Sequence, residues 1–482
     1  MCFRSFAIPV VLSLCFCNLV FGNSWVVRFS GGGQEELYAM TVDGSGNVYV
    51  TGTRNVDVNG SDYLTVKFDP NGNEVWESGY NGPSNGYDIA RAIVADNAGN
   101  VYVTGNSPND VNGDDYLTIK YDPNGDQLWA ARYDGPAHQG DYAYAIAVSP
   151  AGNVYVTGQS EGSGTGGDYA TVKYNPSGVQ QWASRYNNSA ANNWDAACAI
   201  AVDKAGNAYV TGTSTGSTTG TDFLIIKHLN SNGSQTVQRW PTSGTTDEYA
   251  YALVIDDSNN VYVTGISDGN YATIKYNSSM TLQWARRYNG DANGYDCPSA
   301  IAVDSFGNVY VTGKGDVGDG TCDYATVKYN SGGTQQWVTL YNGPASFDDS
   351  ANAIAVDASG NVYVTGQSWN TPNWSSVPHS DYATVKYNSS GVEQWAARYN
   401  GPGKDFSDID DAKKVVVDTS GNVYVAGTSN GFGTGADYAI IKNPNEVGYC
   451  AGPVVGDLNH DCVVDFGDFG EFASHWLESN LQ

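Results

Sequence analysis

The chain has 482 residues and a formal net charge of −28, because 51 Asp and Glu residues outnumber 23 Lys and Arg residues. This acidity argues against nucleic acid as a partner, since proteins neutralise phosphate backbones with basic stripes, and anionic membrane surfaces would also repel the chain. A strongly acidic composition is typical of soluble extracellular proteins that meet divalent cations.

Residues 1–22 predict a secretory signal peptide. Arg4 supplies the positive charge, residues 8–20 form an apolar core, and small Gly22 marks a cleavage site that leaves Asn23 as the first mature residue. The core is too short for a convincing membrane span. We therefore expect an exported protein, secreted or at the cell surface, with no membrane span.

Two cysteines in this segment, Cys15 and Cys17, leave a lipoprotein as the alternative. Leu14 before Cys15 is not the small residue that lipoprotein processing prefers, so a soluble exported protein is the favoured interpretation.

A heptapeptide of the form Gly-Asn-Val-Tyr-Val-Thr-Gly recurs along most of the chain. Its eight copies include Asn47, Asn100, Asn153, Asn207, Asn260, Asn308, Asn361 and Asn422. Most copies are 53 or 54 residues apart, as the steps from 47 to 100 and from 153 to 207 illustrate. A self-similar period of this size predicts stacked supersecondary units.

One repeat unit, residues 353–399, illustrates the strands that we expect in each. Residues 353–356 and 362–365 predict two strands joined by a type I turn, with Asp357 at the first turn position and a Gly at the fourth. Residues 381–387 and 393–399 predict the third and fourth strands. In the fifth unit Asn259 replaces the turn glycine, and Asn tolerates the positive φ that such a turn requires.

Eight units of four short antiparallel strands, with no helical pattern between them, predict an all-β fold: an eight-bladed β-propeller. Radial closure removes the exposed sheet edges that a flat array would leave. The first strand of each unit is rich in Ala and Val, which suits the crowded position nearest the propeller axis. The fourth strand carries Trp, which suits the wide outer rim.

The sequence also predicts how the ring closes. The eighth unit ends at Asn443 without a fourth strand, whereas residues 25–31 align with the fourth strand at residues 395–401. We predict that the N-terminal strand completes the last blade, so that residues 23–443 form the propeller.

The quoted heptapeptide, together with Asp-Tyr-Ala-Thr-Val-Lys-Tyr at residues 381–387 and Gln-Trp-Ala-Ala-Arg-Tyr at residues 394–399, resembles the SBBP-type bacterial β-propeller repeat family. The resemblance covers the chain from about Trp25 to Lys442. That family is named for seven blades, and the count of eight departs from it. The resemblance implies a secreted or surface propeller and no particular reaction.

Residues 444–482 predict a linker and a small loop–helix tail. Residues 456–468 carry oxygen ligands at the spacing of a calcium loop. The stretch resembles one half of a dockerin-type module, which implies calcium as the cofactor and a cohesin-like or cell-surface partner. By that resemblance the ligands are Asp457, Asn459, Asp461, Asp465 and Asp468, with the carbonyl of Val463.

Two departures weaken the dockerin resemblance. Cys462 stands where the loop normally has Gly, and only one loop–helix unit is present. The alternative is an acidic, solvated tail that binds no metal.

Five cysteines remain after the predicted cleavage. Cys450 and Cys462 lie close together in the tail and predict one disulfide, and Cys297 and Cys322 of one repeat unit predict a second. Cys198 lies in an Ala-rich strand, where we expect a buried, inert thiol.

The recurring Trp, Tyr and Lys residues are interpreted as blade packing, because they occupy the same position in nearly every unit. The Asp before each third strand is interpreted as a loop or strand cap: Asp62, Asp115, Asp168, Asp222, Asp323, Asp381 and Asp437. Residues 57–61 and 110–114 look calcium-like, but ordinary Asx turns explain them equally well.

The residues that differ between units are the better candidates for function, since they lie on connecting loops. Trp369 and Trp374, in the long loop at residues 367–379, and Trp194 depart from the repeat and are predicted on one face. They suggest a sugar-stacking platform for a polysaccharide. The alternative is that they anchor long loops.

No catalytic motif stands out in the sequence. We therefore predict a non-enzymatic binding or scaffold module for a protein or polysaccharide. The alternative is a carbohydrate-active enzyme, a glycoside hydrolase or polysaccharide lyase, with its carboxylates in the propeller.

Overall fold

The computed structural model describes residues 24–31, 33–57, 60–109, 113–188, 193–216, 220–240, 247–290, 294–370, 379–402, 408–431 and 435–443. The predicted signal peptide and the predicted tail lie outside these residues. The regular secondary structure within these residues consists of strands. No helix in this part of the chain is long and apolar enough to cross a membrane.

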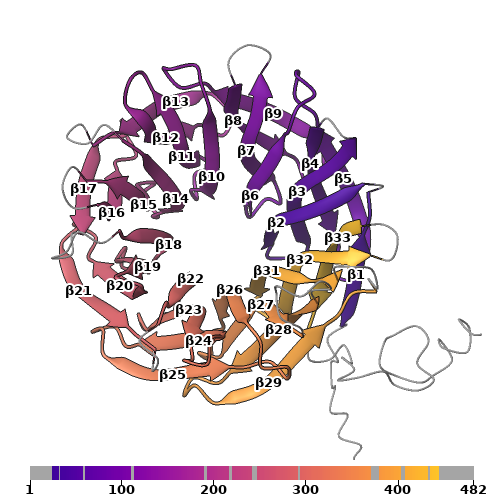
Figure 1. Cartoon of the computed structure of the whole chain (residues 1–482). Coiled ribbons are helices and arrows are strands. Elements are labelled where there is room, and N and C mark those ends of the chain that lie inside the picture. Colours follow the sequence, from indigo (N-terminus) through magenta and orange to yellow (C-terminus); the bar gives the residue numbers. More distant parts are fainter. Residues whose placement is uncertain are drawn as a thin grey trace, which may run out of the picture.

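Eight antiparallel sheets, each with four strands along its main path, surround a common axis (Figure 1). The predicted eight-bladed propeller is therefore confirmed. Blades one and two comprise β2 (Gln34–Val42), β3 (Val48–Asp57), β4 (Gly60–Phe68) and β5 (Glu74–Tyr80), then β6 (Ile89–Ala95), β7 (Val101–Asn109), β8 (Gly113–Tyr121) and β9 (Gln127–Tyr133). Blades three and four comprise β10 (Asp141–Val148), β11 (Val154–Gly162), β12 (Gly166–Tyr174) and β13 (Gln180–Tyr186), then β14 (Asp195–Val202), β15 (Ala208–Thr215), β16 (Thr221–His228) and β17 (Gln235–Trp240).

The second half of the ring repeats this arrangement. Blades five and six comprise β18 (Tyr249–Ile255), β19 (Val261–Ser267), β20 (Asn270–Tyr276) and β21 (Leu282–Tyr288), then β22 (Cys297–Val303), β23 (Val309–Asp316), β24 (Cys322–Tyr329) and β25 (Gln335–Tyr341). Blade seven comprises β26 (Asp349–Val356), β27 (Val362–Trp369), β28 (His379–Tyr387) and β29 (Glu393–Tyr399), and the short β30 (Asp408–Ile409) pairs in parallel with β28. Blade eight comprises β31 (Asp411–Val417), β32 (Val423–Gly431), β33 (Gly435–Lys442) and β1 (Trp25–Phe29).

The first strand of each blade lies nearest the axis, and its turn to the second strand forms as predicted. In blade seven Asp357 Oδ1 accepts hydrogen bonds from the backbone N–H of Ser359 at 2.9 Å and Asn361 at 2.8 Å. Gly360 has φ of 77° and its counterpart Asn259 has φ of 59°. The Asp side chain therefore holds the turn, and only Gly or Asn stands at the left-handed position.

A β-bulge near the start of each inner strand explains the glycine of the repeated Thr-Gly. In blade seven the pairing with β27 skips Asn352 between Ala351 and Ala353. The bulge bends the inner strand against β27, so that a Cβ at Gly366 would lie 2.1 Å from the carbonyl oxygen of Ser350. The repeat has glycine there because no side chain fits.

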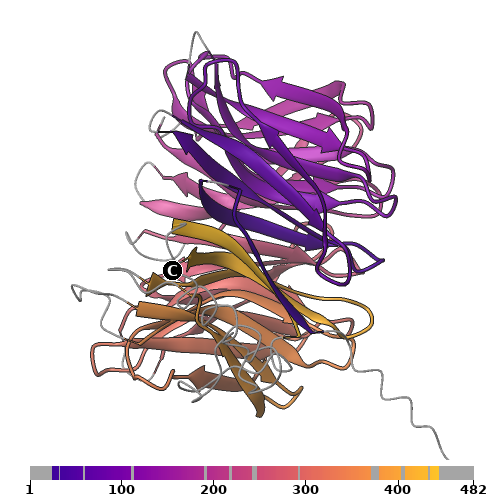
Figure 2. The ribbon, with the colours of Figure 1, turned by 90° about the vertical axis from the view of Figure 1, so that its right-hand side faces the viewer.

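The ring closes as predicted. β1 pairs antiparallel with β33, from Trp25 opposite Lys442 to Phe29 opposite Tyr438. Figures 1 and 2 show these two ends of the propeller side by side, the indigo β1 next to the yellow β33. Trp25 Nε1 also donates to the carbonyl of Pro70 at 3.1 Å, which ties blade eight to blade one.

We name the two faces of the propeller after the strand connections that they carry. The turn face carries the turns from first to second strands and from third to fourth strands. The loop face carries the longer connections from second to third strands and from each fourth strand to the next blade.

Candidate functional site

The recurring Trp and Lys residues pack the blades against one another, as their repetition indicated. In blade six Trp337 Nε1 and Lys328 Nζ both donate to the carbonyl of Ser389 in blade seven, at 3.1 and 2.8 Å. The Lys328 amine also lies 5.0 Å from the ring centre of Tyr310, a cation–π contact. These residues fix the spacing of neighbouring blades and do not form a ligand site.

The recurring Asp of the third strand was predicted to cap a loop or strand, and in three blades it accepts a hydrogen bond from a side chain at the connection before that strand, from Asn109, Thr165 and Asn370. In five blades this Asp forms an ion pair with an Arg of the fourth strand, at 2.5–3.2 Å. The pairs are Asp115–Arg132, Asp168–Arg185, Asp222–Arg239, Asp381–Arg398 and Asp437–Arg28. The register of β-pairing places the Arg beside the Asp, and sequence separation conceals that contact.

Blade six departs from this pattern. Asp323 is 5% exposed, its Oδ1 has no partner, and Leu340 stands in the register position of the arginine. Burial, followed by the charges of Asp349 and Asp319, raises the pKa of Asp323 from 3.8 to about 6.

This raised pKa predicts a pH dependence of stability. Because the folded state binds the proton of Asp323 more tightly than the unfolded state, the contribution of this group falls as the pH rises from about 4 to about 6. We expect the wild-type protein to lose about 1–2 kcal/mol of unfolding free energy over that pH range because of this group, and Asp323→Asn to lack that loss. Denaturant titrations in EDTA at several pH values measure it.

The control for this measurement is Asp381→Asn, which removes the paired aspartate of blade seven. It should lower stability and leave the acid-to-neutral loss in place. Equal pH profiles for wild type and Asp323→Asn would contradict the assignment.

The predicted tryptophan platform is only partly described. Trp194 precedes β14 in blade four, is 42% exposed, and donates through Nε1 to Gln159 Oε1 at 2.9 Å. Trp369 ends β27 in blade seven, and Trp374 lies outside the described residues. Blades five and six separate Trp194 from Trp369, so these two side chains do not form one stacking surface.

The predicted bridge between Cys297 and Cys322 is absent from the structure, where both are free thiols. Cys297 on β22 pairs with Lys314, and Cys322 on β24 pairs with Asp316, so β23 lies between them. Two strands apart, their Cα atoms are roughly 10 Å from each other, beyond the reach of about 7 Å that a disulfide allows. The other predicted pair, Cys450 and Cys462, lies outside the described residues.

Cys198 agrees with the prediction of an inert thiol. Its Sγ donates to the carbonyl of Ala250 at 3.1 Å, and burial raises the pKa of the thiol to about 12. A thiol with this pKa carries almost no thiolate at neutral pH.

The predicted calcium ligands Asp457, Asn459, Asp461, Val463, Asp465 and Asp468 lie outside the described residues. Within the described part of the chain, one group of carboxylates could share a cation: Asp115, Asp134 and Asp141, with ligand atoms within 4.8 Å of one another. Asp115 already pairs with Arg132 at 3.2 Å, and Asp134 with His138 at 2.6 Å. These ion pairs account for the cluster without a metal.

The bulged residues form a ring of unlike side chains close to the axis, near the loop face. This bulge ring consists of Tyr38, Arg91, Tyr144, Cys198, Tyr251, Ser299, Asn352 and Lys413. The residue that follows the bulge is Ala in seven blades and Lys414 in the eighth. One position of the inner strand therefore varies between blades, with Tyr in three of them and five other residue types in the rest, although its surroundings are nearly uniform.

Members of the bulge ring contact one another across the blade boundaries. The guanidinium of Arg91 lies 6.0 Å from the ring centre of Tyr38 and 5.5 Å from that of Tyr144, so that it stands between two aromatic rings. Asn352 Nδ2 donates to Asp411 Oδ1 at 2.7 Å, and Lys413 pairs with the same carboxylate. These contacts link the first three blades to each other, and blade seven to blade eight.

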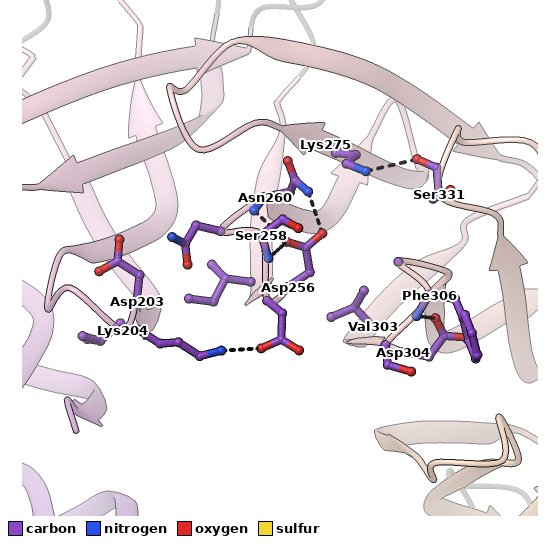
Figure 3. A pocket seen from close by; sticks show the side chains of 16 residues that line it. Asp203, Lys204, Asp256, Ser258, Asn260, Lys275, Val303, Asp304, Phe306 and Ser331 are labelled. Atoms are coloured by element: carbon purple, nitrogen blue, oxygen red, sulfur yellow. Dashed lines mark hydrogen bonds and ion pairs between the residues drawn. The ribbon is translucent and has the colours of Figure 1, made fainter.

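Two hollows lie beside the axis. One of about 340 Å³, between blades eight and one, is lined by residues that include Glu36, Asp411 and Lys413 and thus adjoins the bulge ring. The larger, about 580 Å³, lies at the turns of blades four to six on the turn face (Figure 3). There Lys204 pairs with Asp257 at 2.9 Å and Phe306 is 77% exposed.

The repeats match a known family of sequences. Four stretches of the chain match the SBBP beta-propeller repeat. They are residues 132–164, 283–320, 336–372 and 394–433. Each SBBP match starts in the fourth strand of one blade and ends after the second strand of the next, which supports the predicted resemblance. No curated protein sequence matches the chain.

The chain is also similar to several solved structures. They include a protein of unknown function from Bacteroides caccae (16% identity, TM-score 0.34, covering 64% of this chain and 94% of that one). The extracellular domains of Drosophila Semaphorin 1b (10%, TM-score 0.41, 87% and 86%) and a puromycin hydrolase (11%, TM-score 0.42, 83% and 59%) are also similar. At these identities no shared function follows.

The bulge ring and the Arg–Asp pairs were missed by sequence reasoning. Both were visible as columns of the aligned repeats: a variable position inside an Ala-rich strand, and an Arg that blade six replaces with Leu340. Neither column shows by itself that the first position bulges or that the second meets an Asp, because both depend on pairing between strands.

Proposed function

We propose that the protein is an exported binding module that holds a protein or a polysaccharide against the bulge ring and the surrounding loop face. The observation that carries this proposal is the variation at the bulge, because packing alone favours the same residue in every blade. The recurring Trp and Lys side chains, by contrast, are engaged in contacts between blades.

The sector from blade one to blade three is the best candidate for the ligand contact. Tyr38 and Tyr144 flank Arg91, and aromatic faces beside a guanidinium suit both sugar rings and peptide side chains. Trp194 on the neighbouring blade four adds a partly exposed ring. The adjoining hollow of about 340 Å³ supplies room for a group of the ligand.

Two further parts of the proposal rest on the sequence. The signal-like N-terminus supports export, and the acidic composition supports an extracellular setting. The dockerin-like tail supports attachment through a calcium loop to a cohesin-like or cell-surface partner.

The binding proposal is tested on a polysaccharide array with product analysis, in which a retained sugar identifies the ligand class. We expect Arg91→Ala and Tyr144→Ala to weaken binding at least about tenfold, as hot-spot truncations do. The control is Lys204→Ala, on the turn face, which should leave binding unchanged. Equal binding by all variants would contradict the proposed surface, and new oligosaccharide ends would indicate the alternative, a carbohydrate-active enzyme.

The tail is tested by calcium titration of the full chain. We expect Asp457→Ala to lose one bound calcium ion per chain, because that residue is the first ligand of the loop. Unchanged calcium stoichiometry would count against the dockerin-like tail.

A further inference from the structure

A guanidinium group recurs at one position of the propeller. In five blades the arginine of the fourth strand bonds three partners: the third-strand Asp, the carbonyl of a second-strand Ser, and a Tyr of the preceding blade. In blade eight, for example, Arg28 donates to Asp437 Oδ2 at 2.8 Å, the Ser429 carbonyl at 3.1 Å and the Tyr399 hydroxyl at 3.1 Å.

Two other blades fill this position by different means. In blade one the fourth strand has Gly79, and the guanidinium of Arg54 from β3 lies 3.2 Å from where a Gly79 side chain would begin. In blade five Arg287 turns to Asp268 and to Ser267 Oγ, at 2.5 and 2.6 Å. Seven of the eight blades therefore hold a guanidinium here.

Blade six has lost the guanidinium and kept its acceptors. The pairing of strands in blade six places Leu340 at the position of Arg398 in blade seven. It places Gly315 at the position of Ser368. Asp323 remains, 5% exposed, and its carboxylate forms no hydrogen bond or ion pair with any residue that the structure describes. An unpaired buried carboxylate is costly, so the position favours an added cation.

The other acceptors of the position are also in place. Asp296 corresponds to the first-strand acid that lies beside the guanidinium in other blades, and it is fully buried. The hydroxyl of Tyr288, from the preceding blade, lies 4.0 Å from the point where a side chain at Gly315 would begin. Leu340, which stands in the place of the arginine, is 44% exposed.

We propose that blade six binds the guanidinium of an arginine side chain supplied by a protein partner. The partner's arginine would take the place that Arg28, Arg398 and their counterparts occupy within the chain, with hydrogen bonds to the same kinds of acceptor. Arg–carboxylate pairing of this kind is strong because the fork of N–H donors matches the acceptors.

A metal ion fits the position less well than a guanidinium. Among the described residues the only group of three or more carboxylate, imidazole or thiol ligands close enough to share an ion is that of Asp115, Asp134 and Asp141 in blades two and three. The position in blade six combines the carboxylate of Asp323 with the buried Asp296 and the hydroxyl of Tyr288, the same kinds of group that surround the arginines of five other blades. This site lies outside the bulge ring and does not depend on the function proposed above.

The test measures the melting temperature of the full chain with N-methylguanidinium chloride, with methylammonium chloride as the control for charge. At about 20 mM we expect N-methylguanidinium to raise the melting temperature by about 1–2 °C and methylammonium to leave it unchanged. A peptide Gly-Arg-Gly, compared with Gly-Lys-Gly and with free arginine, separates a side chain in a protein from a free guanidino compound. A response to free arginine but not to the Gly-Arg-Gly peptide would overturn the proposal that the partner is a protein.

Three variants decide where the guanidinium binds. Asp323→Asn removes the carboxylate and Leu340→Arg supplies the missing group, so both should abolish the response, and Leu340→Arg should raise the melting temperature by itself. Arg398→Leu copies blade six in blade seven and should add a second response. A response that persists in Asp323→Asn and Leu340→Arg, or one seen with calcium alone, would overturn the proposal.

Discussion

Removal of β1 lowers the melting temperature by about 10 °C or more, since the change combines a lost strand, an emptied core and a broken ion pair. β1 supplies the whole fourth strand of blade eight, and without it β33 becomes an exposed edge. Phe29 is 7% exposed and packs in the core shared by blades eight and one.

Arg28 adds to this loss because it is the guanidinium of blade eight. Its removal leaves Asp437, whose side chain is 4% exposed, without the ion pair at 2.8 Å. Breaking a buried pair from one side costs about 3–5 kcal/mol. The contact of Trp25 with Pro70, which joins the last blade to the first, is also lost.

Thermal melts of two truncated chains measure this effect. One chain begins at Asn23 and keeps β1, and the other begins at Ser30 and lacks it. The chain that begins at Asn23 serves as the control for the loss of the preceding residues. Equal melting temperatures of the two chains would contradict closure by β1.

Gly366→Ala destabilises the protein by about 3 kcal/mol, the upper end of the usual cost of overpacking. The added Cβ would lie 2.1 Å from the Ser350 carbonyl oxygen, and the atom it meets is backbone of the bulged inner strand. A flexible side chain could move aside, whereas this backbone is held by the pairing of β26 with β27.

The matched control is Gly44→Ala, a glycine with no atom within 4 Å of the position of its added Cβ. It should change the unfolding free energy by less than about 0.5 kcal/mol. Urea titrations of both variants measure the difference. Similar losses for the two glycines would show that the bulge yields, and would remove our explanation of the repeated Thr-Gly.

Strand order and turn chemistry were predictable because they depend on neighbours in the sequence. The Asp357 turn needs contacts only with Ser359, Gly360 and Asn361. The closing strand was predictable because Trp25-Val-Val-Arg-Phe repeats the pattern of the other fourth strands. A missing fourth strand in the eighth unit left one place for it.

The functional residues were harder to predict. The off-pattern tryptophans drew attention by composition, yet Trp194 and Trp369 belong to blades four and seven. The predicted disulfide is wrong for the same reason, because β23 separates Cys297 from Cys322. Closeness within a repeat unit did not translate into contact in space.

The sequence by itself determined the repeat, the four strands of each blade, the turn at each Asp and the count of eight, because these follow from local hydrogen bonding and from periodicity. Only the tertiary structure decided which side chains meet between strands and between blades. Register brings Arg398 to Asp381, 17 residues away, and leaves Asp323 facing Leu340 with no cation. The bulge likewise exists only where an inner strand pairs with its neighbour, so its ring of unlike side chains became visible once the blades were assembled.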